Sequence, residues 1–127
     1  MCAKQYSMQK TTKMKVESIW IGSEEWAFGE WTPANDNTDV IVTLEDRSRW
    51  GATFFSYSNI ISLVNKNKLT GECLSGKYFW ASDMVLADEV SRERIEEIVE
   101  YLVIREPLEF QSIFTKLEEE TNETCYN

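Results

Sequence analysis

The stretch DVIVTLEDRSRWGATFFS, residues 39–56, decides the predicted fold because it reads as two strands joined by a short loop. Apolar and polar side chains alternate in its first half, which places Val40, Val42 and Leu44 on one face of a strand. The second half alternates in the same way from Trp50 onward. Asp-Arg-Ser between the halves favours a hairpin loop of three or four residues over a two-residue turn.

The sequence on either side of this hairpin predicts further strands and helices. Residues 15–21, 24–31 and 77–87 are rich in β-branched and aromatic residues, so we expect them to be extended. Residues 70–76 are expected to form a loop. Asp83, on an otherwise apolar face of the last extended segment, hints at a bulge or a sheet edge.

Two serine-capped helices and a short last helix complete the pattern. The first is expected to start after Ser56 or Ser58 and to end at Gly71, with an apolar face of Ile60, Ile61, Leu63 and Val64. The second is expected to start after Ser91, and its apolar stripe consists of Ile95, Ile98, Val99 and Leu102. The last follows Pro107 and carries Phe110, Ile113, Phe114 and Leu117. We therefore expect an α+β fold, with a four- or five-stranded antiparallel sheet and two or three helices packed on one face.

A chain of 127 residues predicts one domain. We expect it to cover residues 15–117, between a flexible basic arm (1–14) and an acidic solvated tail (118–127). The chain has no apolar run long enough to span a membrane and no secretory signal pattern, and its three cysteines are widely spaced. These features predict a cytoplasmic protein with free thiols.

Acidic residues outnumber basic ones by 22 to 13, which gives a net charge of −9. Residues 16–46 hold eight acids and no base, together with three tryptophans. Such a surface repels nucleic acid and anionic membranes, and it attracts a basic protein. We therefore expect a basic protein partner, with no direct contact to nucleic acid or membrane; the oligomeric state stays open.

The absence of histidine excludes several kinds of catalysis. Neither a Ser-His-Asp triad nor a Cys-His pair can form, and the scattered cysteines do not match a zinc site. Residues 35–39 have the oxygen-rich start of a calcium loop, but Val40 occupies the position that needs glycine. We expect no enzyme activity, no cofactor and no metal. A small carboxylate-dependent enzyme or ligand-binding domain that uses Glu24, Glu25 and Glu30 remains an alternative.

The candidate partner-binding residues combine carboxylates with large aromatic side chains, a combination typical of binding hot spots. The first choice lies within residues 24–39, and consists of Glu24, Glu25, Trp26, Glu30, Trp31, Asp36 and Asp39. The second choice consists of Tyr57, Tyr78, Trp80 and Asp83. A core position for Trp26, Phe28 and Trp31, with the acids on the solvated side, remains the other interpretation.

A small acidic single domain with several tryptophans and no catalytic residues resembles the bacterial immunity proteins that neutralise partner toxins, many of them nucleases. Residues 50–55 and 71–84 also look like a family of small bacterial proteins, to which no activity is attached. The resemblance to immunity proteins implies that carboxylates of this chain occupy the phosphate-binding site of a basic toxin. A nucleic-acid mimic that inhibits DNA-binding proteins is the alternative.

Overall fold

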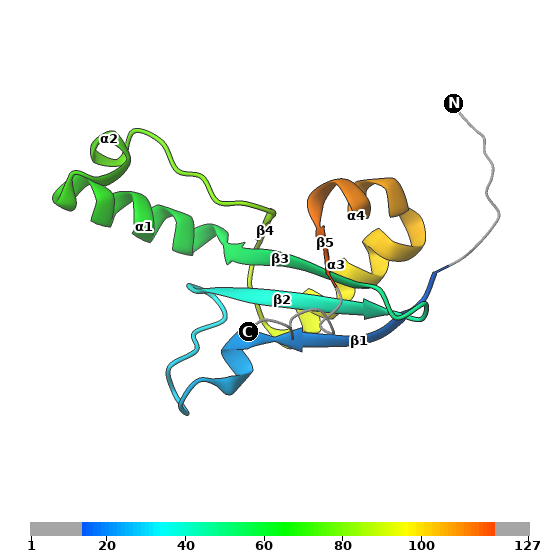
Figure 1. The fold of residues 1–127 in the computed structure, drawn as a ribbon. Helices are drawn as coiled ribbons and strands as arrows, with labels where there is room; N and C mark the ends of the chain where they lie inside the picture. The colour runs from blue at the N-terminus through cyan, green and yellow to red at the C-terminus, as the bar shows by residue number, and fades with distance from the viewer. Residues whose placement is uncertain (1–13, 119–127) are drawn as a thin grey trace, which may run out of the picture.

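A five-stranded sheet with two helices packed on one face and two more that project from its end forms the part of the chain that the computed structural model describes, residues 14–118 (Figure 1). Its strands are β1 (Val16–Ile21), β2 (Asn37–Leu44), β3 (Arg49–Ser56), β4 (Met84–Ala87) and β5 (Thr115–Leu117). Strands β1, β2 and β3 form an antiparallel meander, β4 pairs with β3 in parallel, and β5 pairs with β3 antiparallel. The predicted α+β class is confirmed.

The helices are α1 (Tyr57–Thr70), α2 (Glu72–Gly76), α3 (Arg92–Arg105) and α4 (Pro107–Ile113), and a 3₁₀ turn, η2, covers Gly22–Glu25. None of the helices between residues 14 and 118 has the length and apolar character needed to cross a membrane. The predicted basic arm (1–14) and acidic tail (118–127) fall almost wholly outside the described residues. Met14 packs against the core, so the domain includes at least this residue of the predicted arm.

The hairpin of β2 and β3 confirms the prediction made from residues 39–56. Leu44 N donates to Ser48 O at 3.0 Å and Arg47 N donates to Leu44 O at 2.9 Å, which closes a short loop rather than a two-residue turn. Arg47 has a φ of 76°, although a side chain with a Cβ disfavours this region. The Asp46 carboxylate supports the loop by accepting from Ser48 N and Ser48 Oγ.

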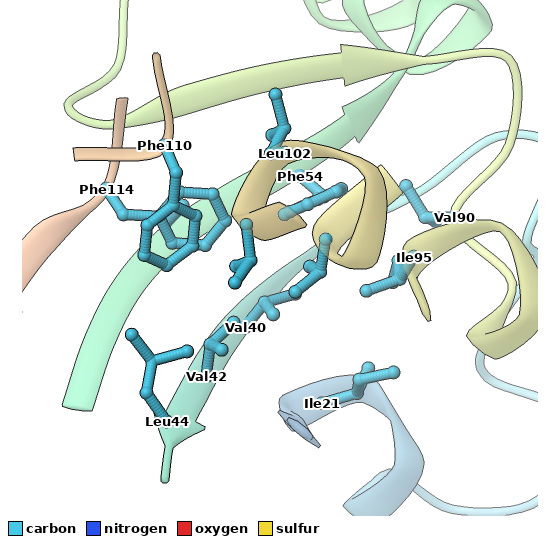
Figure 2. Packing of buried hydrophobic residues seen from close by; sticks show 13 residues of the cluster. Ile21, Val40, Val42, Leu44, Phe54, Val90, Ile95, Leu102, Phe110 and Phe114 are labelled. Carbon is cyan, nitrogen blue, oxygen red and sulfur yellow. The ribbon is translucent and has the colours of Figure 1, made fainter. Parts of the chain in front are cut away.

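The core lies between one face of the sheet and the helices α3 and α4 (Figure 2). β2 contributes Val40, Val42 and Leu44, as its alternation predicts, and β3 contributes Phe54 at 0% exposure. The rings of Phe110 and Phe114 stack with centroids 4.5 Å apart, and Phe114 meets Phe54 edge-on at 6.2 Å. Burying each of these side chains stabilises the fold by about 1.5–3 kcal/mol.

Helix α3 begins and ends where the sequence predicts. Ser91 Oγ accepts from Arg94 N, and the buried side chains of Val90 and Ile95 lie at the two positions of a hydrophobic staple. The apolar stripe faces the core: Ile95, Val99 and Leu102 are buried and Ile98 is partly buried. The helix ends just before Pro107, the first residue of α4, since proline cannot donate the next helical hydrogen bond.

Two predicted strands are wrong over most of their length. Residues 24–31 start in η2 and continue as an irregular segment, in which no residue from 24 to 30 is buried; aromatic content alone does not make a strand. The segment 77–87 is a strand only in its last four residues. Strand β4 pairs only with Thr53–Ser56 of β3, because β5 pairs with the same edge of β3 at Arg49–Gly51.

Strand β5 is also absent from the predicted pattern. The last helix ends at Ile113, and Leu117, predicted on that helix, lies in β5. Asp83 has a φ of 51° directly before β4, and its carbonyl accepts from Thr53 N. The chain therefore bends at Asp83 as it enters the sheet.

Helix α1 projects from the end of β3 instead of lying on the core (Figure 1). Its predicted ends are confirmed, since Ser56 Oγ accepts from Asn59 N and Gly71 ends the helix with a φ of 89°. The predicted apolar face is not part of the core: Ile61 is exposed, Ile60, Leu63 and Val64 are half-buried, and the buried side chains of α1 are Asn59 and Asn67.

The segment after α1 folds back on it. Cys73, Leu74 and Ser75 of α2 have left-handed backbone, so most of the predicted loop 70–76 is a tight reversal. A Cβ on Gly76 would lie 2.8 Å from Val64 O, which shows how closely the two helices approach. We refer to residues 57–82 as the α1–α2 projection.

Candidate partner-binding site

Phe28 is fully solvent-exposed, at 105% of the reference accessibility, although phenylalanine is among the residues most often buried. It lies in a turn closed by a hydrogen bond from Glu30 N to Ala27 O at 3.0 Å. Gly29 has a φ of 87° and Phe28 does not have a positive φ, which fits a type II turn with glycine at its third position. A defined turn therefore holds the phenyl ring in water.

The segments on both sides of this turn are fixed to the sheet and to α3. On the N-terminal side, Ser23 N donates to Thr38 Oγ1 at 2.8 Å, and Trp26 N donates to Ser23 O. On the C-terminal side, Val90 N donates to Pro33 O at 2.8 Å. These bonds restrict the position of the turn before any partner binds, which reduces the entropy cost of binding.

Two carboxylates lie on either side of Phe28 along the chain. Glu30 Oε1 accepts from Ala27 N at 3.3 Å, and Glu25 Oε2 accepts from the indole nitrogen of Trp20 at 2.8 Å. Within residues 14–118, neither carboxylate has an ion-pair partner. We define the aromatic loop as Trp20, Glu25, Trp26, Phe28 and Glu30; all five side chains are exposed.

Glu24, predicted as a binding residue, belongs to a cluster that joins η2 to α3. Its two oxygens accept from Arg92 Nε at 2.6 Å and Nη2 at 2.8 Å, and Arg92 Nη1 donates to Glu96 at 2.7 Å. Arg92 Nη2 also donates to Ile19 O of β1 at 3.0 Å. The hydrogen bonds from Arg92 hold the pKa of Glu24 below its ordinary value, against the opposing effect of desolvation.

We expect the Glu24–Arg92 pair to make stability depend on pH. The pKa of Glu24 is lower in the folded state than its ordinary value of 4.5. The pair therefore stabilises the fold above pH 4.5, and this contribution is lost as the pH falls through the lowered pKa. Glu24→Gln should cost at most about 1 kcal/mol at neutral pH, since both side chains are about one-third exposed and solvent screens the pair. At acid pH the variant should match the native chain.

Urea unfolding of the native chain and of Glu24→Gln across pH measures this difference. Glu45→Gln is the matched control, because Glu45 lies exposed after β2 with no ion pair among the described residues. A loss of the same size at neutral and acid pH would contradict the assignment of this pair.

The other predicted acids are engaged in local hydrogen bonds. Asp36 accepts from Thr32 N and from Asn37 N, which shapes the loop before β2. Asp39 accepts from Thr53 Oγ1 at 3.1 Å across the sheet, and Asp83 accepts from Thr115 Oγ1 at 2.8 Å. Asp39 shares the face of the sheet with Trp20, which pairs with Ile41 two residues along β2.

The predicted aromatic residues divide between two places. Trp26 is exposed in the aromatic loop, whereas Trp31 is half-buried and its indole nitrogen has no partner among the described residues. Tyr57, Tyr78 and Trp80 are exposed on the α1–α2 projection. Figure 1 shows β2 and β3 between the segment that carries Tyr78 and Trp80 and the segment that carries the aromatic loop. The structure therefore separates the two predicted surfaces.

Phe28 and Trp20 were not predicted as binding residues. A core position for Phe28 is one of the two interpretations that the sequence leaves open, and the neighbouring Gly29 is the sequence signal for a turn that exposes it. Trp20 lies in a predicted strand, but a strand pattern does not show which face of the sheet the helices cover. Only the packed structure shows that the helices α3 and α4 cover the opposite face.

No group of three or more His, Cys, Asp or Glu side chains that could hold a metal ion occurs between residues 14 and 118. Cys73 is a half-buried free thiol in α2. Comparisons with protein-family models, with curated proteins and with solved structures found no match to this chain.

Proposed function

We propose that this chain is a non-enzymatic, cytoplasmic inhibitor that binds a basic protein through the aromatic loop, most concretely an immunity protein that neutralises a nuclease-type toxin. The observation that carries the proposal is the fully exposed Phe28, held in a fixed turn between Glu25 and Glu30. Trp20 and Trp26 are exposed within eight residues of Phe28, and several exposed aromatic side chains on one segment are a feature of interaction sites.

The two kinds of side chain in the aromatic loop would have different roles in binding. Phe28 and Trp26 would enter an apolar pocket of the partner, since buried aromatic residues supply most of the affinity in protein interfaces. Glu25 and Glu30 would pair with basic side chains around that pocket, and the net charge of −9 would speed association at low salt. In a nuclease, such basic side chains bind substrate phosphates, so the carboxylates would compete with nucleic acid.

A nucleic-acid mimic has less support from the arrangement of charges. Such a protein needs a long row of carboxylates that no neighbouring cation neutralises. Here Glu17 is paired with Arg47, Glu24 and Glu96 with Arg92, and Asp88 and Glu97 with Arg94.

Affinity capture tests the proposal. The full chain is immobilised and exposed to extract of the native host at low and high salt, and bound proteins are identified by mass spectrometry. We expect a basic protein whose retention falls as salt rises and whose action on nucleic acid is inhibited by the free chain. Captured proteins that are not basic, or that the chain leaves fully active, would contradict the proposal.

Charge reversal then locates the interface. Glu25→Lys with Glu30→Lys should weaken binding of the captured protein by at least about tenfold at low salt, because like charges replace opposite ones. Glu45→Lys with Glu118→Lys is the control: both residues are exposed and the net charge changes equally. Glu45 follows the end of β2 that pairs with the start of β1, whereas η2 follows the opposite end of β1. Titration calorimetry measures both variants, and equal losses would place the interface elsewhere.

A further inference from the structure

The α1–α2 projection exposes a set of large apolar side chains that the core does not use. They are Tyr57, Ile61, Leu69, Leu74, Tyr78 and Trp80, and each is at least half exposed. Figure 1 shows the helices α1 and α2 extending away from the sheet. The loop before β2 contacts the N-terminal part of α1, where Asn35 Oδ1 accepts from Asn59 Nδ2 and Ser62 Oγ. Apolar side chains gathered on a projecting element indicate a docking surface rather than a misplaced core.

The projection is the basic part of an acidic chain. Residues 57–82 hold three lysines and one glutamate, a net charge of +2 in a chain of net charge −9. Lys66 lies 3.7 Å from Glu72. Lys68 and Lys77 have no carboxylate partner within the described range of the chain. The occupant of this surface should therefore be acidic and partly apolar.

The outer face of α3 has this chemistry. Glu93, Glu97 and Glu100 share one side of the helix at a spacing of four and three residues, and all three are exposed. Arg94 partly neutralises Glu97, but Glu93 and Glu100 have no basic partner among residues 14–118. The exposed side chains of Tyr101, Ile104 and Leu108 follow at the C-terminal end. The name acidic ridge is used below for Glu93, Glu97, Glu100, Tyr101, Ile104 and Leu108.

We propose that the acidic ridge of a second copy of this chain binds the α1–α2 projection. Within one copy the two surfaces cannot meet, because the projection extends away from α3 and α4 (Figure 1). A two-fold axis solves this problem: the projection of each protomer contacts the ridge of its partner, and both contacts form at once. This assembly uses neither Phe28 nor the rest of the aromatic loop, so it goes beyond the proposed function.

Sedimentation of the full chain over a range of concentrations tests the proposal directly. We expect a monomer–dimer equilibrium that shifts toward the monomer at high salt, because charge pairs at the edge of the interface are screened. Lys68→Glu with Lys77→Glu, and separately Glu93→Lys with Glu100→Lys, should each weaken dimerisation by at least about tenfold. The control Glu45→Lys with Glu118→Lys should dimerise as the native chain does.

Mixing the two charge-reversed variants gives the decisive result. In each homodimer the projection and the ridge carry like charges, but in the mixed dimer both contacts regain opposite charges. An equimolar mixture should therefore restore a dimer that neither variant forms alone. A chain that is monomeric at every concentration, a dimer that both variants leave intact, or a mixture that stays monomeric would overturn the proposal. Circular dichroism is measured first to confirm that each variant is folded before the two are mixed.

Discussion

Replacing Phe54 by alanine is expected to lower the free energy of unfolding by about 3–5 kcal/mol. Phe54 is the largest of the side chains with no solvent exposure, and it lies on β3, the strand that pairs with three others. Its ring packs edge-on against Phe114, which in turn stacks on Phe110. Alanine would leave a cavity, because the sheet and the helix α4 are held by their other contacts and cannot close the space. A typical domain is stable by about 5–15 kcal/mol, so this loss is a large fraction of the total.

The chain offers a matched control for this prediction. Phe28→Ala removes the same atoms from a side chain that is fully exposed, so it should change the free energy of unfolding by less than about 0.5 kcal/mol. Urea denaturation monitored by circular dichroism measures both variants. Equal losses in the two would mean that Phe54 is not the centre of the core, or that Phe28 is packed in solution.

The sequence predicts those elements whose stability is decided locally or by a single buried face. The hairpin of β2 and β3 follows from strict alternation, and α3 follows from Ser91, a repeated apolar stripe and Pro107. In each case neighbouring residues along the chain specify the conformation, and the same apolar pattern gives the buried side. No knowledge of distant partners is required.

The sequence fails where a distant segment decides the structure. Residues 77–83 have the composition of a strand, but β5, more than thirty residues later in the chain than that segment, occupies the edge of β3 that they would need. A distant segment also explains why the apolar face of α1 stays partly exposed. Its apolar residues predict packing on the sheet, but that face of the sheet is already covered by α3 and α4.

The candidate site shows the same division. The position of carboxylates and aromatics in residues 24–39 is evident from the sequence, but which of them are available to a partner is not. Glu24 is engaged by Arg92, which is 68 residues away, and this pairing becomes visible only after α3 packs beside β1. Glu25 and Glu30 keep their charge unneutralised within the described residues because no α3 arginine pairs with them.

Phe28→Ala should weaken binding of the basic partner by about 2 kcal/mol or more, which is roughly a 30-fold loss of affinity. The phenyl ring makes no core contact that its removal would disturb, so the loss would come from the interface alone. Because the turn is fixed by the Glu30–Ala27 hydrogen bond and by Gly29, the ring is presented in one position, and the loss should appear mainly in the dissociation rate.

Two further variants separate this effect from general changes of the surface. Phe28→Tyr keeps the aromatic ring and should retain most of the affinity, whereas Leu108→Ala removes an exposed apolar side chain from α4, outside the aromatic loop, and should leave the dissociation rate of the basic partner unchanged. Surface plasmon resonance with the captured basic protein gives all three dissociation rates under the same salt. If Phe28→Ala and Leu108→Ala behave alike, the aromatic loop is not the interface; if Phe28→Tyr fails as completely as Phe28→Ala, the pocket on the partner is not a simple apolar one. A selective loss in Phe28→Ala, together with the salt-dependent loss in the Glu25 and Glu30 variant, would assign apolar contact and charge recognition to one continuous surface.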